Sequence, residues 1–506
     1  MIKRIFKNSA LWSAVAVMVN TVMNLCIIPI VSNRLGVEAY GFVTLANTMI
    51  TYIDIISLAI NSFASRYVSI EYHNGKLEKA NKYYSTVFIS DVILSAVILL
   101  FMAVFVPNIN HVLNVSEALS ADVKLLFAIV FIRYIFVLLR SAFEIPAFIK
   151  NKLYLTEQVR TLSYVLQMAL LILTCVVMPA KVWYVGVASA VAALFMLIAE
   201  IAIAAKSTPD LKIAADNFSK DRLKDVISSG IWNSINNIGN QLNSGLDLLI
   251  TNKMLTELAL GLISISKTFG SMCYILANSV SNALKPKQLE YYSKNEIDKL
   301  ITEFKRAMRI TGGICAIIIG GFFACGRDFL DLWLDNDNID VIFSLSMIVL
   351  FGDIVTGVVN PLFYVYTLTK KIKLPCFITV GLGLMNVASM YFLIKYTSLG
   401  MYAVVLTTMV LNMAHFFDTP LYSSYCLKLP YKTFYPTILL HLVNVAALML
   451  VMLAAKSILP AAQTWLALAL KALLCGVIEL TVSLVVMTSK EEKTQLVRKL
   501  KQRFAR

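Results

Sequence analysis

Residues 122–146 read DVKLLFAIVFIRYIFVLLRSAFEIP, a long apolar run interrupted by a few charged side chains. A bilayer core about 30 Å thick is crossed by roughly 20 residues of α-helix, so this segment is long enough to span a membrane. A charge at mid-membrane costs at least about 2.5 kcal/mol, so Arg133, Arg140 and Glu144 must face a cavity or other helices rather than lipid. The segment therefore predicts a membrane helix with one polar face inside a larger helical bundle.

The rest of the chain repeats this pattern. Hydrophobic residues make up 58% of its 506 residues and charged residues 15%, and the mean hydropathy is +0.74. This composition excludes a soluble globule with one core and predicts an all-α polytopic membrane protein with about fourteen transmembrane helices. The predicted spans are residues 10–32, 42–64, 83–106, 122–146, 158–179, 183–205, 226–250, 259–284, 309–330, 341–367, 375–396, 400–426, 437–456 and 464–488. The first run is long enough to be a helix rather than a removed signal peptide.

Lysine and arginine residues are concentrated in alternate loops. One set of loops is strongly basic, as at residues 76–82 and 285–306. The other set has about one lysine or arginine per loop and includes the acidic stretch 328–340. Cytoplasmic loops carry the excess of basic residues, so both ends of the chain are expected inside the cell, with an even number of spans. The same bias accounts for the net charge of +15, so a nucleic acid partner is not expected.

The two halves of the chain resemble each other at one constant offset. The matching pairs include Trp12 and Trp232, Asn20 and Asn240, and Gly41 and Gly261. We therefore predict two six-helix lobes related as a parallel repeat, an arrangement in which transporters commonly hold substrate between the halves. The predicted parts are an N-terminal lobe at 1–205, a cytoplasmic linker at 206–225, a C-terminal lobe at 226–426, two extra helices at 437–488 and a basic cytoplasmic tail at 489–506. The tail is either an amphipathic surface helix or a solvated segment.

Polar residues fall on one face in two spans of the first half. Arg133, Arg140 and Glu144 form one stripe, and Asn47, Asp54 and Asn61 recur every seven residues in the second span. The first stripe indicates either a water-filled, anion-attracting cavity or an ion pair between Arg140 and Glu144 that only joins helices. Asp54 lies near mid-membrane, where it would either neutralise one of the arginines or carry a proton.

The seventh and eighth spans are also polar on one face. The seventh carries Asn233, Asn237, Asn240, Ser244 and Asp247, and the eighth carries Lys267, Ser271, Tyr274, Asn278 and Asn282. The seventh span predicts a cavity-lining or gating helix, although amides also join membrane helices by hydrogen bonds. Asp247 is the expected partner of Lys267. In the second half, Asp353 and Asn360 share a face of the tenth span, where Pro361 can introduce a kink.

The predicted cavity is cationic in the first lobe and more neutral in the second. Its basic residues suit a phosphate or pyrophosphate, and its amides and tyrosines suit sugar hydroxyls. The predicted substrate-binding cations are Arg133, Arg140, Lys267 and Arg34, the lining residues are Asn47, Asn237, Asn240, Ser271, Tyr274 and Asn278, and the charge partners or ion-coupling groups are Asp54, Glu144, Asp247 and Asp353. The eight cysteines stand apart in the sequence, so neither a metal site nor a disulfide framework is expected.

Two segments resemble a known family. Residues 29–41, PIVSNRLGVEAYG, resemble the segment after the first helix of Wzx-type oligosaccharide flippases, members of the multidrug/oligosaccharidyl-lipid/polysaccharide exporter superfamily. Residues 261–267, GLISISK, which follow Asp247, are similar to the pattern of this family at the seventh and eighth helices, from which Ile263 and Ser266 depart. The overall length and the two-lobe layout match as well.

The resemblance implies a protein of the bacterial cytoplasmic membrane that flips a polyprenyl-pyrophosphate-linked oligosaccharide by alternating access, for O-antigen or capsule synthesis. It also implies a proton or sodium gradient as the driving force, no other cofactor, and a polysaccharide polymerase and chain-length regulator as partners. The alternatives are a cation-coupled multidrug exporter, whose cavity should be acidic, and a peptidoglycan-precursor flippase. A membrane enzyme would need a large loop with acid and base groups, whereas the longest loops here are short and basic.

Overall fold

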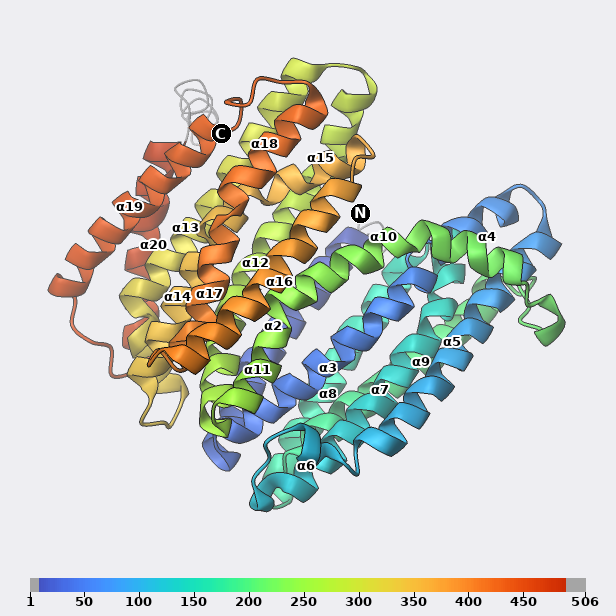
Figure 1. Ribbon diagram of the computed structural model, residues 1–506, viewed down its shortest axis with the longest axis horizontal. Coiled ribbons are helices and arrows are strands. Elements are labelled where there is room, and N and C mark those ends of the chain that lie inside the picture. Colours follow the sequence, from blue (N-terminus) through green and yellow to red (C-terminus); the bar gives the residue numbers. More distant parts are fainter. Residues whose placement is uncertain (1–8, 488–506) are drawn as a thin grey trace, which may run out of the picture. The chain divides into compact units, whose positions relative to one another are not determined.

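The computed structural model describes residues 9–487, and every regular element in that range is a helix (Figure 1). The fold is therefore all-α, as the apolar runs predict. The first eight residues and the predicted basic tail at 489–506, with its amphipathic pattern, lie outside the described residues.

The helices group into two compact units, whose boundaries differ from those of the predicted lobes. Unit 1 comprises Met1–Ser264 and Cys376–Met401, and unit 2 comprises Ile265–Pro375 and Tyr402–Arg506. Unit 1 therefore contains the seventh predicted span and the eleventh, in addition to the first six. The division into six-helix lobes at 206–225 stays a prediction.

Unit 1 is built around the helices that carry the polar stripes. Its elements are α2 (Ser9–Leu35), α3 (Val37–Asn61), α4 (Ala64–His73), α5 (Leu77–Phe105), α6 (Ile109–Val112), α7 (Glu117–Ile149), α8 (Leu153–Val177), α9 (Trp183–Ser207), η1 (Ala215–Asn217), α10 (Lys220–Ser244), α11 (Leu246–Met254), the beginning of α12 (Glu257–Ser293) and most of α16 (Lys373–Tyr396). The most extensive packing joins α7 to α9, α3 to α10, and α2 to α8. Helix α3 also packs against α5 and α7, so its polar face is enclosed by neighbouring helices.

Unit 2 is organised around α13 (Ile297–Trp333). The other elements are the rest of α12, α14 (Ile339–Val359), η2 (Asn360–Leu362), α15 (Phe363–Leu368), α17 (Met401–Met413), α18 (His415–Leu427), α19 (Tyr435–Ile458) and α20 (Trp465–Met487). Helix α13 packs against α14, α19 and α20. Helix α14 ends just before Pro361, whose ring removes a backbone donor, and a short 3₁₀ turn then leads into α15.

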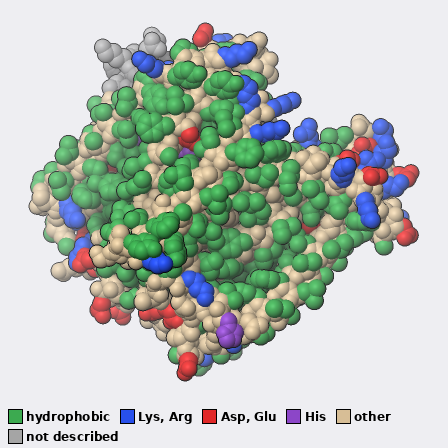
Figure 2. All heavy atoms as spheres, in the orientation of Figure 1, with side chains coloured by type: hydrophobic (Ala, Val, Ile, Leu, Met, Phe, Trp, Pro, Cys, Tyr) green, Lys and Arg blue, Asp and Glu red, His purple; other side chains and the backbone are tan. Residues whose placement is uncertain are grey.

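Eleven of the helices in residues 9–487 are long and apolar enough to cross a membrane. The helices α7, α8 and α10 are not among the eleven. Figure 2 shows hydrophobic side chains over most of the visible face, as expected for a surface in contact with lipid chains. The number of fourteen spans and the inward orientation of both ends stay predictions.

The predicted cytoplasmic linker is held against α5. The Asn81 Oδ1 atom accepts a hydrogen bond from the backbone N–H of Lys212 at 2.9 Å. The Ser85 hydroxyl donates to the carbonyl of Lys212 at 3.2 Å, and the Thr86 hydroxyl accepts from the N–H of Ser219 at 3.1 Å. These bonds satisfy backbone groups of the loop that would otherwise lack partners, so the loop has a defined path over unit 1.

Two glycines paired by the internal repeat lie against each other where α3 meets α12 in unit 1. A Cβ atom added to Gly41 would lie 2.8 Å from the backbone nitrogen of Gly261. A Cβ atom added to Gly261 would overlap the carbonyl of Val37. Small residues let membrane helices approach closely, so this crossing depends on the missing side chains.

Replacing Gly261 with alanine is expected to destabilise the protein by about 1–3 kcal/mol, because overpacking forces the two backbones apart. The matched control is Gly381→Ala, because a Cβ atom there meets nothing within 4 Å. Thermal unfolding of the purified variants in one detergent measures the difference. Equal unfolding temperatures for both variants would show that the crossing tolerates a side chain.

Candidate functional site

The three polar residues of α3 each bond to a different partner in unit 1. Asn47 Oδ1 accepts a hydrogen bond from Arg133 Nη1 at 2.8 Å. Asp54 Oδ1 accepts one from the Tyr134 hydroxyl at 2.8 Å. Asn61 Nδ2 donates to a carboxylate on α5 at 2.9 Å. The seven-residue spacing therefore identified one real face of α3, which is turned toward α5 and α7.

Arg133 has an amide as its partner and no carboxylate. It is half-buried in the middle of α7, and within residues 9–487 no Asp or Glu lies within ion-pair distance of it. Asp54 instead accepts hydrogen bonds from Tyr134 and, at 2.6 Å, from Ser57. Both bonds fall on the Oδ1 atom of Asp54, and no ion pair joins Asp54 to an arginine within residues 9–487. Whether Asp54 neutralises an arginine or carries a proton stays a prediction.

Arg140 is neutralised by an acid that the sequence analysis did not identify. Its Nη1 atom lies 3.0 Å from Glu200 Oε1 on α9, and Glu200 is only 1% exposed. Glu144, the partner expected from the i, i+4 spacing, lies at 4.0 Å from the same nitrogen and at 3.7 Å from Arg160 on α8. Arg160 also binds Glu157 at 2.9 Å. The Arg140 and Glu144 part of the stripe thus belongs to an ion network that joins α7, α8 and α9.

One signal in the sequence could have found Glu200. It is the one charged residue within the predicted span 183–205, where an isolated charge needs a partner on another helix. Arg160 gave a similar signal near the beginning of the fifth predicted span. Neither residue belongs to a periodic stripe, so the search for polar faces passed over both.

The seventh predicted span is broken into two helices. Helix α10 ends at Ser244 and α11 begins at Leu246, and the carbonyl of the intervening Gly245 accepts a hydrogen bond from the Tyr52 hydroxyl at 2.8 Å. Asp247 lies in the first turn of α11 and is 4% exposed. It belongs to unit 1, whereas Lys267 belongs to unit 2, and their pairing stays a prediction.

The amide-rich helix α10 lies close to α16 within unit 1. A Cβ atom added to Gly239 would lie 2.8 Å from the backbone nitrogen of Val380, and Asn386 Nδ2 donates to the carbonyl of Asn243. Of the predicted lining residues on this helix, Asn237 is half-buried and Asn240 is exposed. Arg34, in the last turn of α2, is exposed as well. A role for these three residues in substrate binding stays a prediction.

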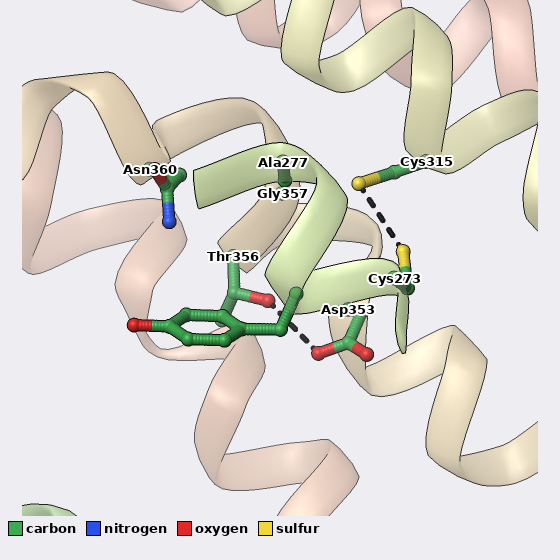
Figure 3. A pocket seen from close by; sticks show the side chains of 8 residues that line it. Cys273, Ala277, Cys315, Asp353, Thr356, Gly357 and Asn360 are labelled. Atoms are coloured by element: carbon green, nitrogen blue, oxygen red, sulfur yellow. Dashed lines mark hydrogen bonds between the residues drawn. The ribbon is translucent and has the colours of Figure 1, made fainter. Parts of the chain in front are cut away.

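In unit 2 the structure brings two of the predicted residues to one small pocket. Figure 3 shows Asp353, Thr356, Asn360 and the thiols of Cys273 and Cys315 around it, and the remaining lining residues are Tyr274, Ala277 and Gly357. The Thr356 hydroxyl donates to Asp353 Oδ1 at 3.2 Å.

Two other predicted residues of α12 do not line this pocket. Ser271 is exposed and bonds to the carbonyl of Lys267 in its own helix at 3.0 Å, and Asn278 is half-buried. The sulfur atoms of Cys273 and Cys315 lie 3.3 Å apart as free thiols, so these two cysteines do not stand apart in the fold. Across the described residues, no group of three or more His, Cys, Asp or Glu side chains is placed to hold a metal ion.

Comparison with known proteins places this fold in a family. The family model for polysaccharide biosynthesis proteins matches residues 6–287. The chain is 30% identical over 415 residues to the uncharacterized membrane protein EpsK of Bacillus subtilis (strain 168), and the match covers 81% of each chain.

Solved structures share the fold at low sequence identity. The lipid II flippase MurJ in an inward closed conformation matches with a TM-score of 0.67 and 15% identity, covering 93% of this chain and 98% of that one. An inward-facing multidrug resistance MATE family transporter matches with a TM-score of 0.62 and 14% identity, covering 86% of this chain and 98% of that one. The fold expected from the resemblance is thereby confirmed, because two solved proteins share it and one of them is described as a member of the same exporter superfamily. The chain is a multi-pass bacterial membrane protein that belongs to the polysaccharide biosynthesis protein family.

Proposed function

We propose that this protein flips a polyprenyl-pyrophosphate-linked oligosaccharide across the cytoplasmic membrane for the synthesis of a surface polysaccharide. The observation that carries the proposal is Arg133, a cation in the middle of a membrane helix whose hydrogen-bond partner in the described chain is an amide. A charge in that position is costly unless a ligand of opposite charge compensates it. A pyrophosphate linked to a sugar supplies that charge.

The geometry around Arg133 supports an anionic ligand. Asn47 holds one guanidinium nitrogen through its Oδ1 atom, which leaves further N–H donors of the guanidinium for phosphate oxygens. Guanidinium groups bind phosphates through paired, charge-assisted hydrogen bonds. Asp54 makes no ion pair with this guanidinium within residues 9–487, and its Oδ1 atom accepts hydrogen bonds from Tyr134 and Ser57.

The other predicted site residues receive different roles in this proposal. Arg34 and Lys267 would add positive charge along the path of the pyrophosphate, and the side chains of Asn237, Asn240, Ser271, Tyr274 and Asn278 would bond to sugar hydroxyls. Arg140 serves helix packing, because Glu200 neutralises it. An exporter of organic cations is disfavoured, because Arg133 would repel its substrates.

The proposed mechanism is alternating access driven by a proton or sodium gradient. The oligosaccharide would cross within the protein while the polyprenyl tail stays in the lipid. The chain would act as a transporter and not as an enzyme. It would deliver its product to a polysaccharide polymerase and a chain-length regulator.

Deletion of the gene, followed by analysis of lipid-linked oligosaccharides and surface polysaccharide, tests this proposal. We expect lipid-linked oligosaccharide to accumulate and the surface polymer to be lost, with both effects reversed by the wild-type gene. Unchanged glycan together with new sensitivity to cationic dyes would contradict the proposal and identify a drug exporter. Arrest of growth with accumulated peptidoglycan precursor would instead identify a flippase for that precursor.

A further inference from the structure

Helix α5 carries a buried carboxylate that the proposed substrate site does not use. Asp91 is 0% exposed, and across residues 9–487 no Lys, Arg or His lies within ion-pair distance of it. It sits in the middle of an apolar helix, where an uncompensated negative charge is costly. A residue of this kind needs either a bound cation or a bound proton.

Side chains from two further helices converge on this carboxylate. Asn61 of α3 donates its Nδ2 to Asp91 Oδ1 at 2.9 Å, and the Ser141 hydroxyl of α7 donates to Oδ2 at 2.8 Å. The Oδ1 atom of Asn61 is buried and has no hydrogen-bond partner. A carboxylate, an amide and a hydroxyl from three helices therefore meet at one point with a net charge of −1, and the amide turns its nitrogen toward the carboxylate.

The ionisable side chains on the surrounding helices do not supply the missing positive charge. Those on α3 and α7 nearest in sequence to the cluster are Asp54, Tyr134, Arg140 and Glu144. Helix α4 carries Arg66, Tyr67, Glu71, Tyr72 and His73, η1 carries Asp216, and the beginning of α10 carries Lys220, Asp221, Arg222, Lys224 and Asp225. Arg140 binds Glu200, and Arg222 binds Asp225 at 3.3 Å and the Tyr83 hydroxyl at 3.1 Å. Within residues 9–487 the charge of Asp91 is therefore left without an ion-pair partner.

We propose that Asp91, Asn61 and Ser141 form a binding site for one monovalent cation, a sodium ion or a proton, whose gradient drives transport. The inference rests on the proposed function for its role in transport, but the binding site itself stands on the geometry of α3, α5 and α7. Hard cations are bound by oxygen ligands of this kind. A proton would instead occupy one oxygen of Asp91 and make the residue neutral.

The same two helices hold both the cation site and the substrate arginine. Helix α3 carries Asn61, which is part of the cation site, and Asn47, which bonds to Arg133. Helix α7 carries Ser141 of the cation site and Arg133 itself. Binding of the cation ties α3 and α7 to α5, so it fixes the spacing of the helices that hold Arg133. Such coupling is reciprocal, so binding of substrate must change the affinity for the cation by the same factor.

Two binding measurements on the purified full-length protein, without any glycolipid, test the site. Radioactive sodium binding reports a bound sodium ion, and the infrared carboxyl absorption recorded against pH reports a protonated aspartate. We expect the wild type to give one of the two signals and Asp91→Asn to lose it. Asn61→Ala and Ser141→Ala should weaken sodium binding or shift the titration by roughly tenfold, the effect of losing one buried hydrogen-bond partner.

The matched control is Asp225→Asn, which removes from α10 a carboxylate that accepts a hydrogen bond from the Tyr83 hydroxyl at 2.8 Å, and it should keep the signal. The proposal is overturned if wild type gives neither signal, or if Asp91→Asn keeps the wild-type signal. If a variant fails to fold, infrared carboxyl spectra of the wild type, recorded against pH and with and without sodium, still show whether a carboxyl group of the protein binds a cation.

Reconstituted vesicles separate this inference from the proposed function. If Asp91 binds the cation but wild-type vesicles flip no lipid-linked oligosaccharide, the proposed function fails and the site stands. If wild-type vesicles flip it faster under an imposed gradient and Asp91→Asn vesicles respond equally, the coupling role fails and the flippase stands.

Discussion

Replacing Arg133 with alanine is expected to slow flipping of a lipid-linked oligosaccharide roughly 30-fold or more in reconstituted vesicles. The loss follows because removing one partner of a buried, hydrogen-bonded charge pair costs about 2 kcal/mol or more. Folding should change little, because the lost partner within the chain is the amide of Asn47 and no carboxylate is left unpaired. Initial flipping rates, compared at equal amounts of folded protein, measure the effect.

Two further variants make this prediction sharper. Arg133→Lys keeps the charge but loses the planar fork of donors, so it should restore only part of the rate. Lys124→Ala removes a basic residue from the same helix α7 near its beginning and should leave the rate unchanged. A wild-type rate for Arg133→Ala would contradict the assignment of Arg133 to the substrate.

Glu200→Leu is expected to produce the largest loss of stability, about 3–5 kcal/mol, because it removes the close partner of the largely buried Arg140 and leaves it only Glu144 at 4.0 Å. Glu200 is 1% exposed and lies 3.0 Å from Arg140, and a guanidinium cannot escape by losing its proton. Unfolding curves of the purified variants measure the loss. The double variant Arg140→Met/Glu200→Leu should recover most of it, because a buried ion pair can be replaced by packed apolar side chains.

An exposed ion pair provides the comparison. Asp122→Ala removes the partner of Lys181, which lies at 3.5 Å with half of its side chain exposed. Pairs of this kind contribute about 1 kcal/mol or less. If Glu200→Leu is no more harmful than Asp122→Ala, or if the double variant is worse than Glu200→Leu alone, the ion network does not stabilise the bundle.

The all-α fold could be predicted from the sequence because apolar runs of about 20 residues are long enough to cross a membrane as helices. The sequence also predicted the polar faces, since helical periodicity places Asn47, Asp54 and Asn61 on one side of α3. The sequence analysis failed to identify ion-pair partners that come from a neighbouring helix. The spacing of Arg140 and Glu144 suggested a pair within α7, but Glu200 arrives from α9 and binds more closely.

The residues that the sequence analysis missed are single polar side chains in apolar helices. Asp91 and Glu200 have no periodic companions, so no stripe indicated them. The contact between Cys273 and Cys315 joins α12 to α13, which a spacing rule for cysteines cannot detect. Such groups become visible only when tertiary packing shows what surrounds them.

The polarity of α10 has a consequence for how the chain enters the membrane during synthesis. This helix carries five asparagines, at positions 233, 236, 237, 240 and 243, and it is not among the segments apolar enough to span lipid alone. The insertion machinery releases segments into lipid according to their hydrophobicity, so α10 would be retained or rejected if it were presented by itself. Helix α10 packs extensively against α3, which is synthesised earlier, so α10 can enter the membrane by packing against it. Correct assembly therefore depends on the synthesis of α3 before α10.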